Sequence, residues 1–156
     1  MDHSTIQLAA VHEGGDAWLA DCSEHPGLVR SAWDDEHLAP IATGTSWLVA
    51  ETQLVLGMPA LSRIREEHRG PVLADPSSDT AQWLVPPGAA EELADLRAVK
   101  VHPAGWSLRC PPTRRSIEGR FWLARPDGSG RLTDPAVLAA AFGPGGGRRL
   151  SAKAPA

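Results

Sequence analysis

Four arginines and two tryptophans in the last third of the chain have the composition of a site for a nucleotide or a single strand. They are Arg109, Arg114, Arg115 and Arg120, with Trp106 and Trp122 nearby. Guanidinium groups bind phosphates, and aromatic rings offer surfaces on which bases stack. Basic residues around a strand turn are also common on ordinary solvent-facing surfaces. The sequence therefore predicts either a phosphate-binding strip or a solvated face.

Acidic residues offer a second chemistry, the binding of divalent cations. Glu51 lies in the apolar run Trp47–Leu54, which follows a turn at Thr43–Gly44, and the end of this run is where we expect any nucleotide or metal ion to bind. A hard cation needs several oxygen ligands, and Glu51 is a single carboxylate. The acids available to rebuild such a site are Glu51, Asp75, Asp79 and Asp95.

The other reactive side chains do not form catalytic or metal-binding patterns. Cys22 and Cys110 belong to no CxxC pair, which is typical of buried or incidental thiols in a reducing compartment. The histidines show no HxxxH spacing, and no serine lies in a G-x-S-x-G elbow. The glycine-rich run 143–147 follows an expected helix and lacks the Lys-Ser/Thr of a phosphate loop. We therefore expect no resident metal or other cofactor.

The length and charge of the chain limit its function further. Its 156 residues suit one domain, and 42% apolar content is enough for an ordinary core. A net charge of −4 argues against a protein whose main task is to grip nucleic acid by its phosphates. No basic stretch followed by an apolar one opens the sequence, and no window approaches the length of a membrane span. We expect a cytoplasmic protein with no membrane partner.

Strands interleaved with helices predict an α+β or α/β fold with a mixed sheet flanked by three or four helices. The domain is expected over 14–142, after a segment 1–13 that is either a short strand (Thr5–Val11) or a loose tail, and before a disordered tail over 143–156. We expect helices over Ala17–Cys22, from Pro59 to about Arg65, over Ala89–Leu96 and over Pro135–Phe142, with Leu28–Trp33 as a further helical turn after the first. The expected strands are Leu38–Thr43, Trp47–Leu54, Val72–Ala74, Ala81–Val85, Val99–Val101, Trp106–Cys110 and Arg120–Leu123.

Turn residues suggest how these elements connect. Gly14-Gly15-Asp16 has the composition of a turn followed by a helix N-cap. The first two strands are expected to face each other across the Gly44 turn, and Val99–Val101 is expected to pair with Trp106–Cys110. Asp134-Pro135 is expected to cap the last helix. The six tryptophans are most simply anchors of the core.

Five segments, in this order, resemble the N-terminal domain of bifunctional DNA primase/polymerases of the archaeo-eukaryotic primase type, especially the short actinobacterial forms. They cover about half of the chain and are Pro40–Gly44, Leu56–Ile64, Gly70–Pro76, Trp83–Gly88 and Gly105–Pro112. The resemblance implies an Asp-x-Asp pair after the Ile-Ala-Thr-Gly turn, a His on the strand before Pro-Pro-Gly, and an Asp before the Gly-aromatic strand. These groups would hold two cations against nucleotide phosphates.

This chain departs from the family pattern at all three motifs. Thr52, Gln53 and Leu54 occupy the place of the acidic pair, or Glu51, Thr52 and Gln53 if the alignment slips by one residue. Thr80 stands at the position of the His. Val99 stands at the position of the last Asp, which only a shift of four would replace with Asp95. Metal binding and nucleotidyl transfer are therefore not expected from these positions.

Two hypotheses follow for the function. The first is a non-catalytic primase/polymerase-like domain that acts as an accessory or regulatory protein by binding a protein, a nucleotide or nucleic acid. Its binding candidates are Thr43, Gly44, Trp106, Arg109, Arg114, Arg115 and Arg120. The second is an active nucleotidyltransferase that uses Mg²⁺ or Mn²⁺ at a site rebuilt from Glu51, Asp75, Asp79 or Asp95.

Overall fold

The computed structural model describes residues 3–143, with side chains from residue 10 onward. The helices within this range are α1 (His3–Asp21), α2 (Pro26–Asp34), α3 (Leu54–Ser62), α4 (Ala90–Leu93) and α5 (Pro135–Phe142), with short 3-10 turns at Glu66–His68 and Pro76–Ser78. The strands are β1 (Ala39–Ala42), β2 (Leu48–Gln53), β3 (Val72–Asp75), β4 (Thr80–Val85), β5 (Lys100–Val101), β6 (Ser107–Cys110) and β7 (Phe121–Ala124). The tail expected to be disordered lies, from residue 144 onward, outside the described residues.

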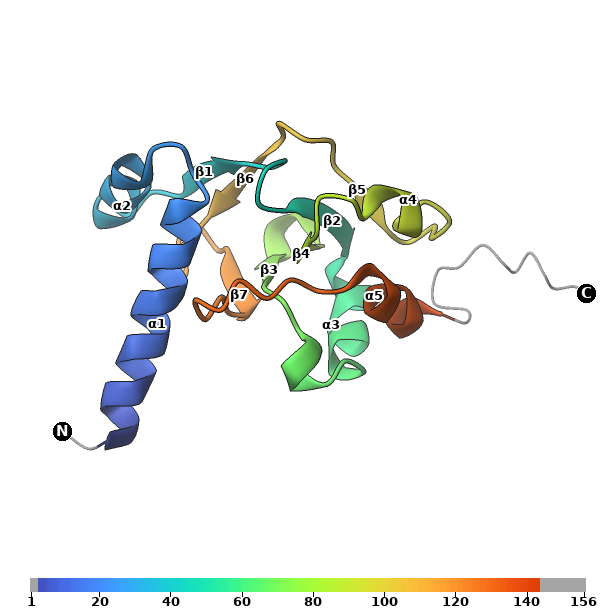
Figure 1. The fold of residues 1–156 in the computed structure, drawn as a ribbon, viewed down its shortest axis with the longest axis horizontal. Helices are drawn as coiled ribbons and strands as arrows, with labels where there is room; N and C mark the ends of the chain where they lie inside the picture. Colours follow the sequence, from blue (N-terminus) through green and yellow to red (C-terminus); the bar gives the residue numbers. More distant parts are fainter. Residues whose placement is uncertain (1–2, 144–156) are drawn as a thin grey trace, which may run out of the picture.

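A five-stranded sheet in the order β5-β2-β4-β3-β7 forms the centre, and β1 and β6 form a separate two-stranded sheet (Figure 1). These elements confirm the α+β class. All pairings among the described strands are antiparallel, whereas the sequence predicted a mixed sheet. Parallel neighbours need long crossover connections, and the short connections of this chain favour antiparallel neighbours instead.

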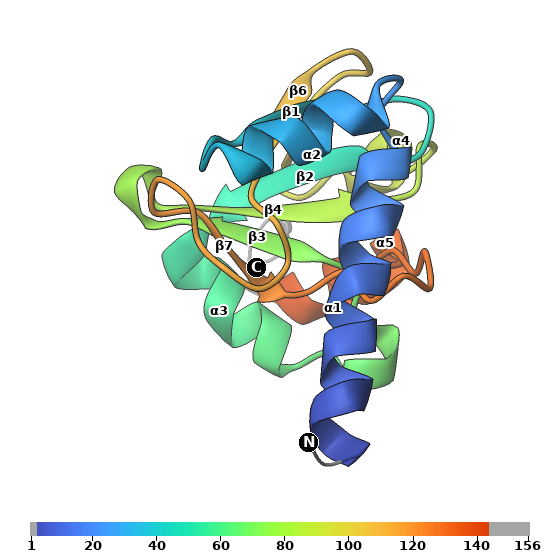
Figure 2. The same ribbon diagram turned by 90° about the vertical axis from the view of Figure 1, so that its left-hand side faces the viewer.

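The central sheet buries both of its faces. One face, with Val49 and Leu84, packs against α1, α2 and the small sheet β1-β6 (Figures 1 and 2). The other face, with Ala50 and Trp83, packs against α3, α4 and α5. Because successive residues of a strand point to opposite faces, β2 and β4 contribute to both cores. Layers of helices on both sides thus hold the sheet.

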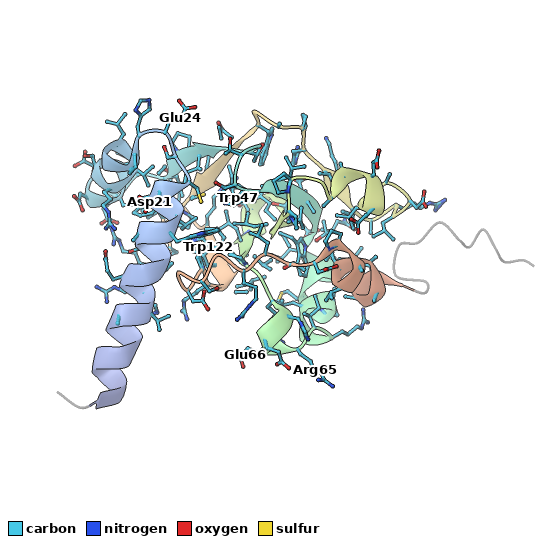
Figure 3. The ribbon with its side chains drawn as sticks, viewed as in Figure 1. Asp21, Glu24, Trp47, Arg65, Glu66 and Trp122 are labelled. Carbon is cyan, nitrogen blue, oxygen red and sulfur yellow. The ribbon has the colours of Figure 1, made fainter. Side chains whose placement is uncertain are left out.

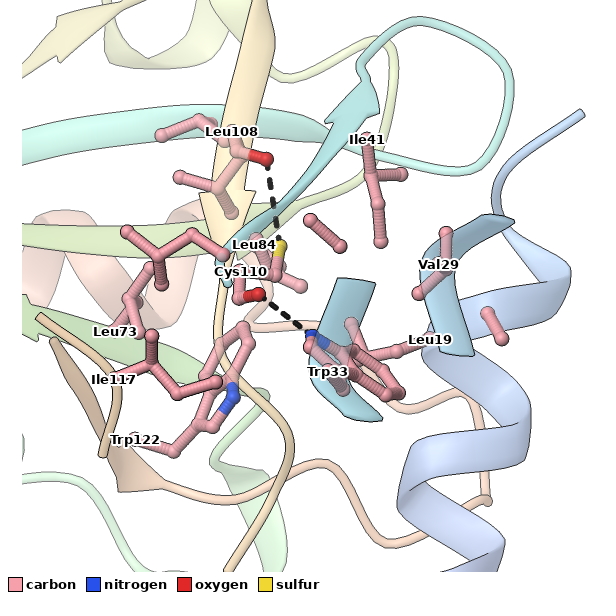
Figure 4. Packing of buried hydrophobic residues seen from close by; sticks show 14 of the residues in the cluster. Leu19, Val29, Trp33, Ile41, Leu73, Leu84, Leu108, Cys110, Ile117 and Trp122 are labelled. Carbon is pink, nitrogen blue, oxygen red and sulfur yellow. Dashed lines mark hydrogen bonds between the residues drawn. The ribbon is translucent and has the colours of Figure 1, made fainter. Parts of the chain in front are cut away.

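Four tryptophans are buried in these cores, as expected, and each indole N–H has an acceptor. Trp33 donates to the carbonyl of Cys110 at 2.9 Å (Figure 4), and Trp122 donates to the carbonyl of Pro111 at 2.9 Å. Trp47 donates to the sulfur of Cys22, and Trp83 donates to the hydroxyl of Thr52. Figure 3 shows Trp47 and Trp122 inside the domain, between α1 and the sheet. Trp18 and Trp106 are half-buried.

The two cysteines are free thiols. Burial raises the pKa of Cys110, and it also raises the pKa of Cys22 despite hydrogen bonds from Trp47 and Ser46. Both side chains therefore act as small apolar groups at neutral pH. This agrees with the expectation of buried thiols.

The N-terminal segment is helical, so the predicted strand Thr5–Val11 and the predicted turn at Gly14-Gly15-Asp16 are wrong. A Cβ at Gly15 would lie 2.2 Å from the carbonyl oxygen of Pro126. A Cβ at Gly14 would lie 3.4 Å from that of Asp127. The glycines therefore let α1 approach the turn after β7, and the tertiary contact overrides their low helix propensity.

Two predicted pairings are also wrong. β1 and β2 flank the Gly44 turn but belong to different sheets, because β1 pairs with β6. β5 pairs with β2 instead of β6. The loops at Thr43–Trp47 and His102–Trp106 each carry the chain from one sheet to the other. The hydrogen bonds from Thr43 N to Trp106 O and from Gly105 N to Thr43 O join the two loops.

Replacing Gly15 with Ala tests the close approach of α1. Alanine favours the helix by about 1 kcal/mol, but its methyl group would collide with the backbone of Pro126 and should cost about 1–3 kcal/mol. We expect a net loss in the free energy of unfolding, measured by urea titration. Gly27→Ala, in α2 with nothing within 4 Å of the new methyl group, is the matched control and should be neutral or slightly stabilising. Equal stability of the two variants would contradict this packing.

Candidate functional site

The sheet face that carries Val49 and Leu84 becomes polar at one end of its strands. In the β2–β4 register Glu51 lies opposite Gln82, and in the β3–β4 register Gln82 lies opposite Leu73. Asp75 and Thr80 form the last pair of β3 and β4. Cross-strand partners point to the same face of a sheet. The candidate site is therefore a polar strip that continues the apolar face.

Glu51 is engaged by a histidine that the sequence analysis set aside. Nε2 of His102 lies 2.9 Å from Oε1 of Glu51, and the side chains are 10% and 27% exposed. The imidazole stacks on Trp106, with ring centroids 3.9 Å apart and ring planes 4° apart. This pair therefore occupies one oxygen of the carboxylate with a positioned imidazole.

The Thr43–Gly44 turn contacts the loop that carries His102 and Trp106. The Thr43 hydroxyl donates to the carbonyl of Pro103 at 3.1 Å, and Thr43 is itself buried. Gly44 has a φ of +127°, and a Cβ there would lie 3.0 Å from that of Ala104. These two candidate ligand residues thus position the loop that carries His102 and Trp106.

Asp75 is engaged even more completely. One oxygen accepts from Ser77 at 2.8 Å, and the other accepts from Ser78 at 2.9 Å and lies 3.1 Å from Nη2 of Arg120. Arg120 also donates to the buried amide of Gln82 at 3.1 Å. Burial alone would raise the pKa of Asp75, but the serine hydrogen bonds and the Arg120 charge outweigh it and lower that pKa.

An open groove of about 410 Å³ lies beside the strip. Glu51 and Thr80 both line it, together with Lys100. Thr52 also reaches it but is buried and accepts from the Trp83 indole. Val99 belongs to the core on the opposite face. Of the three positions where the family motifs were sought, the structure therefore brings Glu51 and Thr80 together and places Val99 elsewhere.

The two remaining acids, Asp79 and Asp95, lie outside the polar strip. Asp79 satisfies the start of α3: its carbonyl accepts from Leu54 N at 2.9 Å and its carboxylate accepts from Val55 N at 3.3 Å. With these acceptors α3 begins at Leu54, so Pro59 lies inside the helix and not in its first turn as predicted. Asp95 is exposed on the turn after α4, which ends earlier than predicted.

The predicted arginine strip is divided among different partners. Arg120 donates to the carbonyl of Arg109 at 3.3 Å, so these two are neighbours, and Arg109 also pairs with Glu118 at 3.2 Å. Arg115 instead donates to the carbonyl of Trp33 in α2 at 2.7 Å. Arg114 is exposed. Trp106 is stacked on His102, so its ring on that side is covered.

Sequence analysis missed His102 and Gln82. His102 is 51 residues from Glu51, and only the pairing of β5 with β2 brings them together. Gln82 lies within the largely apolar strand β4, so the sequence does not indicate that its side chain belongs to a polar site. No local pattern indicates either contact.

The residues present do not fit a two-metal centre. Among the side chains described, from residue 10 to residue 143, there is no group of three or more His, Cys, Asp or Glu suited to holding a cation. His102 occupies one oxygen of Glu51, and Ser77, Ser78 and Arg120 engage both oxygens of Asp75, so a cation at Asp75 would have to displace those partners. None of the described helices has the length and apolar character needed to span a bilayer.

Comparisons with models of protein families, with curated proteins and with solved structures give no match. What the chain does must therefore be inferred from its own residues and their geometry.

Asp75→Asn tests whether the ion pair between Asp75 and Arg120 stabilises the fold. We expect a loss of about 1–3 kcal/mol in the free energy of unfolding at pH 7, because Arg120 loses its charged partner. The folded pKa of Asp75 is lowered, so the wild type keeps this contribution above the unfolded pKa of about 3.9 and loses it as the pH falls through the folded value.

Urea unfolding at pH 7 and at about pH 3, below that reference value, measures the effect. The difference between wild type and Asp75→Asn should narrow in acid, whereas exposed Asp95→Asn should stay near the wild type at both pH values. A difference for Asp75→Asn that does not change with pH would show that the charge is not what stabilises this face.

Proposed function

We propose that the chain is a non-catalytic binding protein with a primase/polymerase-like framework, acting in the cytoplasm as an accessory or regulatory factor. The observation that carries the proposal is the engagement of the acids on the polar strip. Glu51 is bound by His102, and Asp75 is bound by Arg120 and two serines. The function is then to bind a ligand and not to transfer a nucleotide.

Metal-assisted transfer needs carboxylates that remain available to cations. Two hard cations neutralise the charge that develops between the attacking and leaving oxygens, and each needs several oxygen ligands. The Asp75–Arg120 pair is largely buried, with side chains 10% and 14% exposed, and removing either partner would leave a buried charge. The internal pairs therefore favour a binding role over catalysis.

One observation favours the alternative, an Mg²⁺- or Mn²⁺-dependent nucleotidyltransferase. Glu51 and Asp79 line the same open groove, with Lys100 beside them. This would supply two carboxylates and a cation for a phosphate. Against it, the Asp79 carboxylate accepts a backbone N–H of α3, and Asp95 does not line this groove.

A manganese and nucleotide titration separates the two functions. We expect the melting temperature of the pure protein to show no manganese-dependent response to nucleoside triphosphates, because the acids are internally paired. We also expect no primer synthesis or template extension. Glu51→Gln, which keeps a hydrogen-bonding group beside His102, should behave as the wild type does in both assays. A manganese-dependent product that disappears in Glu51→Gln but persists in Asp95→Asn would establish the enzyme instead.

A further inference from the structure

A second groove lies on the other side of the domain, where α1 passes β7 and the segment before β3. It consists of two adjoining hollows, one of about 380 Å³ and one of about 20 Å³. Both are lined by Arg69, Arg125, Asp127 and Arg131. His12 lines the larger hollow and Trp18 the smaller one. We call this the arginine groove.

The arginines of this groove differ from Arg120 in their partners. None of the three lies within 4.0 Å of a carboxylate oxygen of the described residues. Nε of Arg69 donates to the carbonyl of Ile64 at 2.8 Å, and Nε of Arg125 donates to the carbonyl of Thr113 at 3.2 Å. These bonds hold the guanidinium groups in place and leave their terminal N–H groups for a ligand.

Two side chains that line the groove each have a nitrogen without a partner within the described residues. Nε2 of His12 is buried and has no hydrogen-bond partner among the described residues. A buried polar atom without a partner is costly, so a polar group that reached Nε2 of His12 from the larger hollow would stabilise this face. The indole nitrogen of Trp18 has no acceptor among the described residues, whereas the four buried tryptophans each have one.

Hydrogen bonds with Thr113 fix the position of α1, which carries His12 and Trp18. Thr113 donates its hydroxyl to the carbonyl of His12 at 3.0 Å and to the carboxylate of Asp16 at 2.7 Å. The backbone N–H of Thr113 also donates to Asp16 at 2.7 Å. The glycine contact with the turn after β7 lies between these residues. His12 and Trp18 thus line the groove from a helix that hydrogen bonds with Thr113 hold in place.

The groove also contains acids, and its charge balance remains positive. Asp127 and Glu66 contribute two carboxylates against three guanidinium groups. Asp127 accepts a hydrogen bond from the backbone N–H of Ser129 at 2.9 Å, which partly engages its charge within its own turn. Figure 3 shows Glu66 at the periphery of the domain. The cationic groups therefore exceed the anionic ones.

We propose that the arginine groove binds the phosphate group of an anionic ligand. Guanidinium groups suit phosphate because they donate two parallel hydrogen bonds to it. The volume of the larger hollow lies within the range of small-molecule sites. The source of the phosphate is a free nucleotide or the backbone of a short nucleic acid. The proposal gives the proposed binding protein a ligand class, and it does not depend on Glu51 or on a metal.

Titration calorimetry in a chelating buffer tests the groove, with ATP and a short oligothymidylate as separate ligands. The key variant is Arg131→Gln, because Arg131 is exposed and its side chain makes no hydrogen bond within the described residues, so folding should be unaffected. We expect it to weaken binding about ten- to a hundredfold, as expected for loss of one charge-assisted hydrogen bond. Arg131→Lys should weaken binding less, because the charge remains. Arg97→Gln, at an exposed arginine that does not line either hollow, is the charge-matched control and should bind as the wild type does.

Binding of either ligand with this dependence on Arg131 supports the groove, and the ligand that binds identifies the phosphate source. Absence of binding by both ligands, or equal weakening by Arg97→Gln and Arg131→Gln, would overturn the proposal. NMR provides a second measurement, since the indole N–H signal of Trp18, assigned with Trp18→Phe, should shift on binding. Because these titrations contain no free divalent metal, their failure is distinct from failure of the manganese assay.

Discussion

The antiparallel register between β2 and β4 determines where almost every other group lies. Its six pairs run from Leu48 opposite Val85 to Gln53 opposite Thr80. Because side chains alternate between faces, a slip of one residue would move Trp83 and Val85 to the face that carries Glu51 and would move Gln82 into the opposite core. One core would then receive the polar amide of Gln82, and each core would exchange its β4 side chains for ones of different size. The burial of both faces thus specifies the register, and the register places the polar strip.

The polar strip is tolerated at the edge of a core because its groups satisfy one another. Arg120 bridges Asp75 and Gln82, and the loop carrying His102 brings an imidazole to Glu51. A buried charge without a partner would destabilise the fold, whereas a satisfied network helps to specify one arrangement. The same pairing makes a cation compete with His102 for Glu51 and with Arg120 and two serines for Asp75. Stability and the proposed absence of catalysis therefore share one physical cause.

Elements with strong local signals could be predicted from the sequence. The central strands over 72–74 and 81–85 and the helix capped by Asp134 are present, and the Asp134 carboxylate accepts from Ala136 N at 2.7 Å. Elements determined by distant contacts could not. Gly14-Gly15 has the local composition of a turn, and only its contact with Pro126 explains why the helix continues.

The candidate site shows the same division between local and distant signals. Glu51 could be singled out from its place on an apolar strand, but its partner His102 comes from a loop 51 residues away. The arginine strip was expected from composition alone, and composition does not indicate which side chain an arginine faces. Arg115 turns to α2, and Arg120 is neutralised on the sheet. Three arginines that no local pattern singled out converge instead on one groove.

The arginines on the sheet face and those in the arginine groove differ in how many internal acceptors they already have, and this difference decides which of them are available to a ligand. Arg120 has a buried carboxylate, an amide and a carbonyl as acceptors, so exchanging them for a ligand would cost much of what the ligand supplies. Arg131 makes no hydrogen bond through its side chain within the described residues, and Arg69 and Arg125 are held only at Nε. A phosphate there would add hydrogen bonds without breaking internal ones. Pre-organisation with free donors therefore favours the arginine groove over the sheet face as the place where this domain binds an anion.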